Sequence, residues 1–113
     1  MLSIDKLKEF GADTSKGLGR CVNNEALYLR LVAMVPKNDS FAKLNQAINA
    51  NNLEEAFSAS HSLKGILSNL ELTPLLEPVL EITERLRNKE NCDYSIYLDE
   101  INKKRQELEK MCE

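Results

Sequence analysis

The apolar residues of this chain recur at intervals of three and four positions, a spacing that places side chains on one face of an α-helix. No stretch shows the strict alternation of apolar and polar residues that is typical of a half-buried strand. The stripes predict a short helix near residues 4–10 and further helices near 24–35, 40–48, 53–70, 73–87 and 94–111. We therefore expect an all-α fold: an up-down antiparallel four-helix bundle with an additional short N-terminal helix.

Residues that favour helix ends or turns set the expected boundaries. Ser3 is a suitable N-cap for the first helix, and Gly11 is suited to its C-terminal end. Pro36 is expected to end the helix that begins near residue 24, and Pro74 would occupy the favoured first position of its own helix. Residues 13–19 are rich in turn formers, so we expect a turn there.

The length and composition indicate one folded domain. The chain has 113 residues, which is the length of a single domain, and we assign residues 1–113 to it. It is 42% hydrophobic and 29% charged, which is ordinary for a folded protein and unlike a disordered one. Each helix alone would be marginal in water, so the packing of the apolar stripes must supply the stability.

The charge pattern argues against nucleic acid as a partner. The formal net charge is -3, and no basic patch could neutralise a run of phosphates. The one basic run, residues 103–105, lies among glutamates and is interpreted as a solvated helix face.

The same sequence contains no sign of secretion or of a membrane span. Charged residues at positions 5, 6, 8 and 9 interrupt the N-terminus, and no segment approaches the roughly 18 apolar residues of a span. The cysteines, Cys21, Cys92 and Cys112, form no Cys-x-x-Cys pair and are interpreted as reduced thiols. We expect a cytoplasmic protein without membrane association. One histidine and scattered cysteines offer too few ligands for zinc, so no metal site is expected.

The helix predicted over residues 53–70 has two stripes. The first is the core seam, formed by Ala56, Ser60, Leu63, Leu67 and Leu70. The second has the same spacing one residue later, and consists of His61, Lys64, Gly65 and Ser68. Because successive residues are about 100° apart around a helix, the second stripe is turned away from the core. His61, the only histidine, is therefore expected to be exposed or half-exposed.

The second stripe could carry a transferable phosphoryl group. A neutral imidazole is a competent nucleophile near neutral pH. Lys64, one turn away, could stabilise charge on oxygens attached to His61. Gly65 costs about 1 kcal/mol relative to alanine in mid-helix, which suggests that clearance is needed there. However, a lone histidine is often an incidental surface residue, and these patterns alone leave both interpretations open.

The residues around His61 resemble a known signature. Residues 60–65 read Ser-His-Ser-Leu-Lys-Gly and are followed by Asn69 and Leu70. This closely resembles the His-x-Leu-Lys-Gly and Asn-Leu-Gly pattern of histidine-containing phosphotransfer (HPt) domains. The resemblance extends over nearly the whole chain, in the segments 17–20, 28–31, 44–56 and 75–87.

The resemblance implies a function and a set of roles. His61 would be the phosphoacceptor, Lys64 the electrostatic partner and Gly65 the residue that gives clearance. Such domains reversibly accept the group from an aspartyl phosphate on a receiver domain and donate it to another receiver, in a multistep two-component phosphorelay. They are phosphoryl carriers without catalytic machinery. The receiver supplies Mg²⁺, so no cofactor is expected here, and we expect a monomer.

This chain departs from the family pattern at one position. The resemblance also implies which residues form a docking surface. The family commonly has Gly where this chain has Glu71, which is expected to alter the helix exit or the rim of the docking surface. Thr83 could accept a hydrogen bond from the imidazole Nδ1–H, leaving Nε2 free to attack; the alternative is that Thr83 is a polar residue at the edge of the bundle seam. The expected docking residues are Phe57, Ser58, Ser68, Asn69, Thr83 and Arg87.

Three alternatives remain. The first is a helical adaptor that binds receiver or kinase domains without being phosphorylated. The second is the dimerisation and phosphoacceptor domain of a histidine kinase, but such domains usually have an acidic residue after the histidine, where this chain has Ser62. The glycine-rich phosphate loops of an ATP-binding domain are also missing. The third is an independent hydrolase, for which no paired nucleophile and base are evident.

Overall fold

The computed structural model describes residues 1–113 and is entirely helical, which confirms the predicted all-α class. It has seven α-helices and one 3₁₀ turn. These are α1 (Ile4–Phe10), α2 (Thr14–Arg20), α3 (Glu25–Met34), η1 (Val35–Lys37), α4 (Ser40–Asn49), α5 (Leu53–Asn69), α6 (Thr73–Arg87) and α7 (Ser95–Met111).

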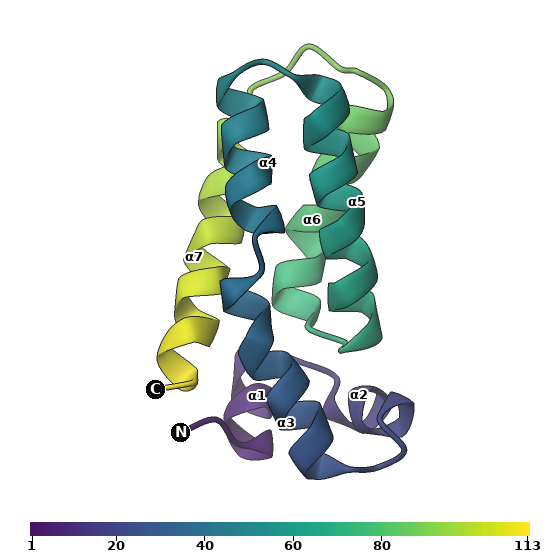
Figure 1. The fold of residues 1–113 in the computed structure, drawn as a ribbon, viewed down its shortest axis with the longest axis vertical. Coiled ribbons are helices and arrows are strands. Elements are labelled where there is room, and N and C mark those ends of the chain that lie inside the picture. Colours follow the sequence, from purple (N-terminus) through teal and green to yellow (C-terminus); the bar gives the residue numbers. More distant parts are fainter.

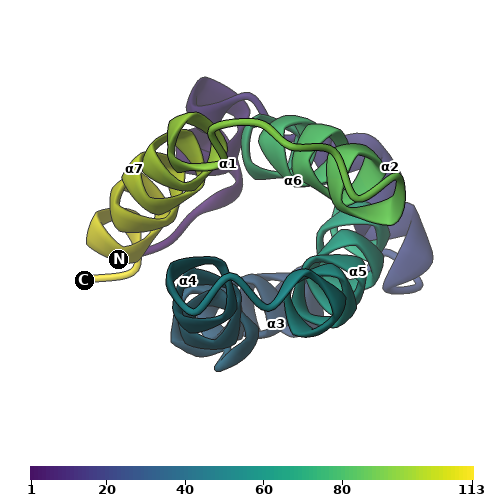
Figure 2. The same cartoon turned by 90° about the horizontal axis from the view of Figure 1, so that it is seen from above.

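The four C-terminal helices lie along the long axis of an elongated molecule of 41 × 24 × 20 Å (Figure 1). Helix α4 packs on α5, α5 on α6, and α6 on α7. Seen from above, they follow one another in that order around the molecule (Figure 2). Between α7 and α4, the amides of Asn45 and Asn102 exchange hydrogen bonds of 3.4 and 3.3 Å, and the Arg105 guanidinium lies 5.4 Å from the ring centroid of Phe41.

The local end signals of the first helix act as the sequence predicts. The Ser3 hydroxyl accepts a hydrogen bond of 3.2 Å from the Lys6 amide, as an N-cap does. Gly11 follows the helix with φ of 109°, a left-handed conformation that glycine adopts without steric cost. These features depend only on neighbouring residues, which is why the sequence was enough to find them.

The N-terminal part differs from the expectation, because three helices precede α4 (Figure 1). Residues 13–19, expected as a turn, lie mostly in α2, so that prediction is wrong. The Asp13 side chain caps this helix by accepting from the Lys16 amide at 3.2 Å. Gly17 lies against the ring of Tyr28, where an added Cβ would be 2.5 Å from Cε1. Two glycines weaken this helix locally, so contacts with α3 must help to hold it.

The core is one continuous cluster to which every α-helix except α2 contributes, and Leu18 of α2 packs against it. Its largest fully buried side chains include Tyr28, Phe41, Leu63, Leu67 and Ile101. None of the helices combines the length and the apolar composition that crossing a membrane requires.

Candidate functional site

Helix α5 presents His61 on its outer face. The helix starts at an N-cap, Asn52, whose side chain accepts from the Glu55 amide at 3.2 Å. The core seam is buried as predicted, whereas His61 and Gly65 are exposed and Lys64 is half-buried. Even the polar member of the seam, Ser60, is fully buried, and its hydroxyl donates to a carbonyl one turn earlier. The predicted second stripe and the exposure of His61 are therefore confirmed.

An aromatic ring and a guanidinium line one side of the imidazole. Phe57 stacks on His61 with ring centroids 5.8 Å apart and planes 19° from parallel. From the neighbouring helix α6, the Arg87 guanidinium carbon lies 5.6 Å from the Phe57 centroid, and Arg87 also pairs with Glu84. Two of the residues expected around His61, Phe57 and Arg87, are thus brought together. The Arg87 guanidinium thus contacts the same phenyl ring that stacks on the imidazole.

Lys64 and Gly65 leave the next turn open and positively charged. None of the ion pairs in the protein involves Lys64, so its ammonium is free to meet an incoming anion. A Cβ added to Gly65 would have no atom of the chain within 4 Å. Packing within the protein therefore gives no reason for a glycine at this position.

The role expected for Thr83 is wrong. Thr83 is only 2% exposed, and its hydroxyl donates to the Val79 carbonyl at 2.6 Å instead of accepting from His61. A threonine hydroxyl can be buried in a helix in this way because the carbonyl four residues earlier accepts its hydrogen. Helix α6 is rotated about its axis so that Thr83 lies on the buried face, whereas Leu80 is 39% exposed.

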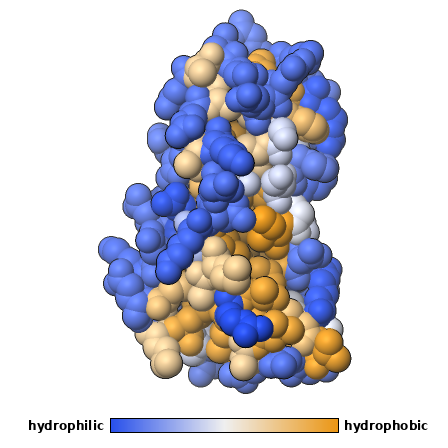
Figure 3. All heavy atoms as spheres, in the orientation of Figure 1, coloured by the Kyte–Doolittle hydropathy of each residue, from blue (hydrophilic) through white to orange (hydrophobic).

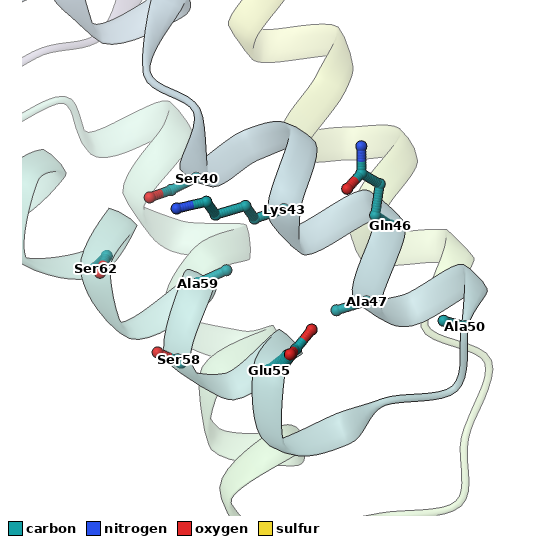
Figure 4. Close-up of a pocket in the computed structure, with 9 residues that line it drawn as sticks. All are labelled: Ser40, Lys43, Gln46, Ala47, Ala50, Glu55, Ser58, Ala59 and Ser62. Carbon is teal, nitrogen blue, oxygen red and sulfur yellow. The ribbon is translucent and has the colours of Figure 1, made fainter.

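On the α4 side of His61, a polar groove of about 480 Å³ lies along the junction of α4 and α5 (Figure 4). Ser58 and Ser62 of α5 line it, with Lys43 of α4 on the opposite side. Lys43 is paired with Asp39 at 3.4 Å in an exposed position. Ser58, which was expected to take part in docking, is exposed on the rim of this groove.

The far end of the second stripe meets an apolar surface. The Ser68 hydroxyl donates to the Lys64 carbonyl at 2.6 Å, and Asn69 is exposed. Beside them, a groove of about 280 Å³ lies between α3 and the end of α5, lined chiefly by Leu31, Met34, Val35, Ile66 and Leu70. Figure 3 shows apolar surface gathered in the lower half of the molecule, where Figure 1 places α3.

Sequence reasoning missed this apolar groove. Leu31 and Met34 belong to the apolar stripe of the helix predicted near residues 24–35, yet Met34 is 61% exposed. A stripe shows which residues share a face, but it does not show how much of that face a neighbour covers. The only available signal was the width of the stripe, which does not distinguish a buried face from a partly open one.

The side chains that commonly bind metals are dispersed. No group of three or more histidine, cysteine, aspartate or glutamate side chains is placed to hold a metal ion. Cys21 is buried, Cys92 is exposed and Cys112 is half-buried, and all three are free thiols.

A helical protein that presents one exposed histidine, with a free lysine and an open glycine on the following turn, has the features of a phosphoryl carrier. The model of the Hpt domain family matches residues 38–113, so the chain belongs to this family. The match covers α4 to α7 and includes His61, Lys64 and Gly65. Members carry phosphoryl groups in two-component signalling, interact with receiver domains and are in general carriers, not catalysts.

The family match leaves the N-terminal part of the chain uncovered. Residues 1–37 lie outside the family match, so the resemblance seen at residues 17–20 and 28–31 stays a prediction. No curated protein matches the chain. No solved structure matches it either.

Proposed function

We propose that this protein is an intermediate carrier in a multistep phosphorelay. His61 accepts a phosphoryl group from the aspartyl phosphate of one receiver domain and passes it to another receiver. The observation that carries the proposal is the set of three residues on one face of α5: an exposed His61, an unpaired Lys64 at i+3 and an unobstructed Gly65 at i+4.

On this chain the transfer needs no catalytic group beyond these residues. The unprotonated nitrogen of the neutral imidazole attacks phosphorus, and the other ring nitrogen keeps its proton. An N–P bond forms while the bond between phosphorus and the aspartyl oxygen breaks, so the aspartate leaves as a carboxylate. Lys64 offsets the charge on the phosphoryl oxygens. The same steps in reverse pass the group to a second receiver, and the receiver contributes Mg²⁺ with its own acidic residues.

The docking surface proposed for the receiver surrounds His61. It includes Phe57 and Arg87 on the α6 side, Ser58 on the α4 side, and Ser68 and Asn69 two turns further along α5. Ser58, Asn69 and Arg87 are exposed, and Phe57 and Ser68 are half-buried on the same side of the molecule as His61. A monomeric state and a cytoplasmic location stay predictions from the sequence.

Incubation with receiver domains tests the proposal directly. A panel of purified receivers, charged with acetyl phosphate, is mixed with the wild type and with His61→Gln. Label that is stable in base and labile in acid should appear on the wild type alone, because phosphohistidine has these properties and the protein has a single histidine. Equal label on both proteins would contradict the assignment of His61. Binding of a charged receiver without any label would instead favour the unphosphorylated adaptor.

A further inference from the structure

The end of α5 contains a residue in a costly backbone conformation. Glu71, two residues after the helix, has φ of 54°, in the left-handed region that disfavours residues with a Cβ. This gives a physical reason for the glycine that the resembling pattern has at this place. Since this chain keeps a glutamate there, contacts made by its side chain or its neighbours must offset the cost.

Arg20 from α2 makes those contacts. Its Nη1 lies 2.6 Å from Oε1 of Glu71, whose side chain is 18% exposed. The same nitrogen also donates to the Ser68 carbonyl, and it lies 3.5 Å from the Asn69 carbonyl. The last carbonyls of a helix have no partner within the helix, so an external donor stabilises them. One guanidinium thus joins α2 to both the helix end and the residue that follows it.

Two more hydrogen bonds from the N-terminal helices reach the same turn. The buried hydroxyl of Tyr28 donates to the Leu70 carbonyl at 2.9 Å. The Asp13 amide donates to the Glu71 carbonyl at 3.0 Å. All of these donors lie before residue 38, outside the part of the chain that the family model matches. The N-terminal helices therefore hold the end of the histidine helix through three separate side-chain and backbone donors.

This end of α5 is close enough to His61 to lie under a docked receiver. Ser68 follows His61 by seven residues on the same stripe, which is about 10 Å along the helix. A standard protein interface covers about 800 Å² on each partner, a patch with a radius of about 16 Å. A receiver centred on His61 would therefore also cover Asn69 and part of the apolar groove between α3 and α5.

We infer that Arg20 and Glu71 are positioning residues for receiver docking. Their ion pair fixes α2 and α3 against the end of α5, and so holds the edge of the docking surface, at Ser68 and Asn69, in a single conformation. The inference rests on the proposed function. Neither residue touches the reacting atoms. The pair therefore acts on the affinity for the receiver and leaves the transfer step at His61 unchanged.

Transfer kinetics with Arg20→Gln test this inference. We expect the receiver concentration for half-maximal transfer to rise three- to tenfold, while the maximal rate stays within twofold of the wild type. Lys16→Gln is the matched control, because it removes an exposed positive charge from the same helix and Lys16 takes part in no ion pair. It should change neither parameter. An unchanged half-maximal concentration in Arg20→Gln would overturn the inference.

Direct labelling with phosphoramidate separates docking from chemistry. This small donor can phosphorylate histidine without a docking surface, so Arg20→Gln and the wild type should be labelled at the same rate. A slower rate in Arg20→Gln would show that the substitution disturbs His61 itself, which would contradict a role in docking. Circular dichroism at the assay temperature establishes that each variant is folded. If Arg20→Gln does not fold, Glu71→Gln replaces it in both assays, since it removes only the charge of the pair.

A double variant tests whether the two residues act together. In a Glu71→Gly background the positive φ no longer needs a compensating contact, so Arg20→Gln should have less than half of its original effect on the half-maximal concentration. An equal effect in both backgrounds would contradict the pairing. The two proposals fail separately: if the wild type takes no label from any receiver, the proposed function is wrong, whereas a labelled wild type with unaltered Arg20→Gln kinetics removes only the positioning role.

Discussion

The ring of Phe57 lies nearly parallel to the imidazole of His61, one helical turn before it, with the ring centroids 5.8 Å apart. The guanidinium of Arg87 lies over the same phenyl ring. An aromatic ring in this position restricts the rotation of the imidazole about its side-chain bonds. The imidazole therefore samples fewer orientations, and a larger fraction of them is the orientation that reacts.

Replacing Phe57 should therefore slow transfer without moving His61 along the helix. In Phe57→Leu we expect a several-fold lower transfer rate, because leucine keeps apolar volume but not the flat surface. Proton NMR offers a direct check, since the signals of the single histidine can be identified without ambiguity. The ring current of Phe57 should shift the imidazole protons of the wild type, and this shift should disappear in Phe57→Leu. Identical imidazole shifts in both proteins would argue against the stack in solution.

Gly65→Ala should separate stability from function. A Cβ there meets nothing within 4 Å, so alanine should raise the free energy of unfolding by about 0.5–1 kcal/mol. Transfer from a receiver should nevertheless fall, because the added methyl group stands where the partner approaches. Gly19→Ala is the matched control: it is equally unobstructed on α2, so stability should rise and transfer should stay the same. Chemical denaturation and receiver kinetics measure the two effects. Unimpaired transfer in Gly65→Ala would remove the clearance role.

Gly17→Ala should have the opposite effect on stability. Its Cβ would lie 2.5 Å from Cε1 of Tyr28, so the buried ring must move. Overpacking of this kind costs about 1–3 kcal/mol. Chemical denaturation of Gly17→Ala beside Gly19→Ala compares an obstructed and an open position on one helix. Equal stabilities of the two variants would show that the Tyr28 ring is not packed against α2.

Lys64→Gln should slow the transfer step itself. Loss of the only unpaired cation one turn after His61 should lower the maximal rate by about tenfold, equivalent to about 1.4 kcal/mol in the barrier. Lys103→Gln, an exposed lysine of α7 without an ion pair, controls for the change in net charge. Rapid-quench measurements with saturating receiver report the maximal rate. If Lys64→Gln and Lys103→Gln behaved alike, the electrostatic role would belong elsewhere.

The buried hydroxyl of Tyr28 should make stability depend on alkaline pH. Tyr28→Phe leaves the Leu70 carbonyl without its partner, which should cost about 1–3 kcal/mol at neutral pH. Burial, assisted by nearby negative groups, raises the pKa of Tyr28 from 10 to about 12. Between these values the unfolded chain loses the tyrosine proton while the folded protein keeps it, which favours unfolding. The advantage of the wild type over Tyr28→Phe should therefore be complete below pH 10 and should shrink as the pH rises through 12.

Urea denaturation of both proteins at pH 8 and at pH 11 measures this difference. Other tyrosines and lysines titrate in the same range, but they are common to the two proteins and cancel in the comparison. A gap that stays constant between the two pH values would show that the Tyr28 hydroxyl is not buried.

The arrangement of the site residues was predictable because it depends on spacing within one helix. Leu63 and Leu67 define the buried side of α5. The positions of His61, Lys64 and Gly65 around the helix axis are then fixed, because each residue is rotated by a constant angle from the one before it. The caps at Ser3 and Gly11 were equally accessible, because each is formed by residues within one turn. The resemblance added the expected role of each residue, which spacing alone had left open.

What the sequence determined by itself is thus the set of local helices, the stripe around His61 and the family to which its motif points. The tertiary structure decided the rest. Thr83 is buried because α6 is turned by its packing on both neighbours, and residues 14–20 form a helix beside Tyr28. The contact between Arg20 and Glu71 joins residues 51 positions apart in the chain, whose meeting depends on how α2 packs against the end of α5. The periodicity of the sequence describes each helix separately. Contacts between helices depend on how two helices are rotated relative to each other and how closely they approach.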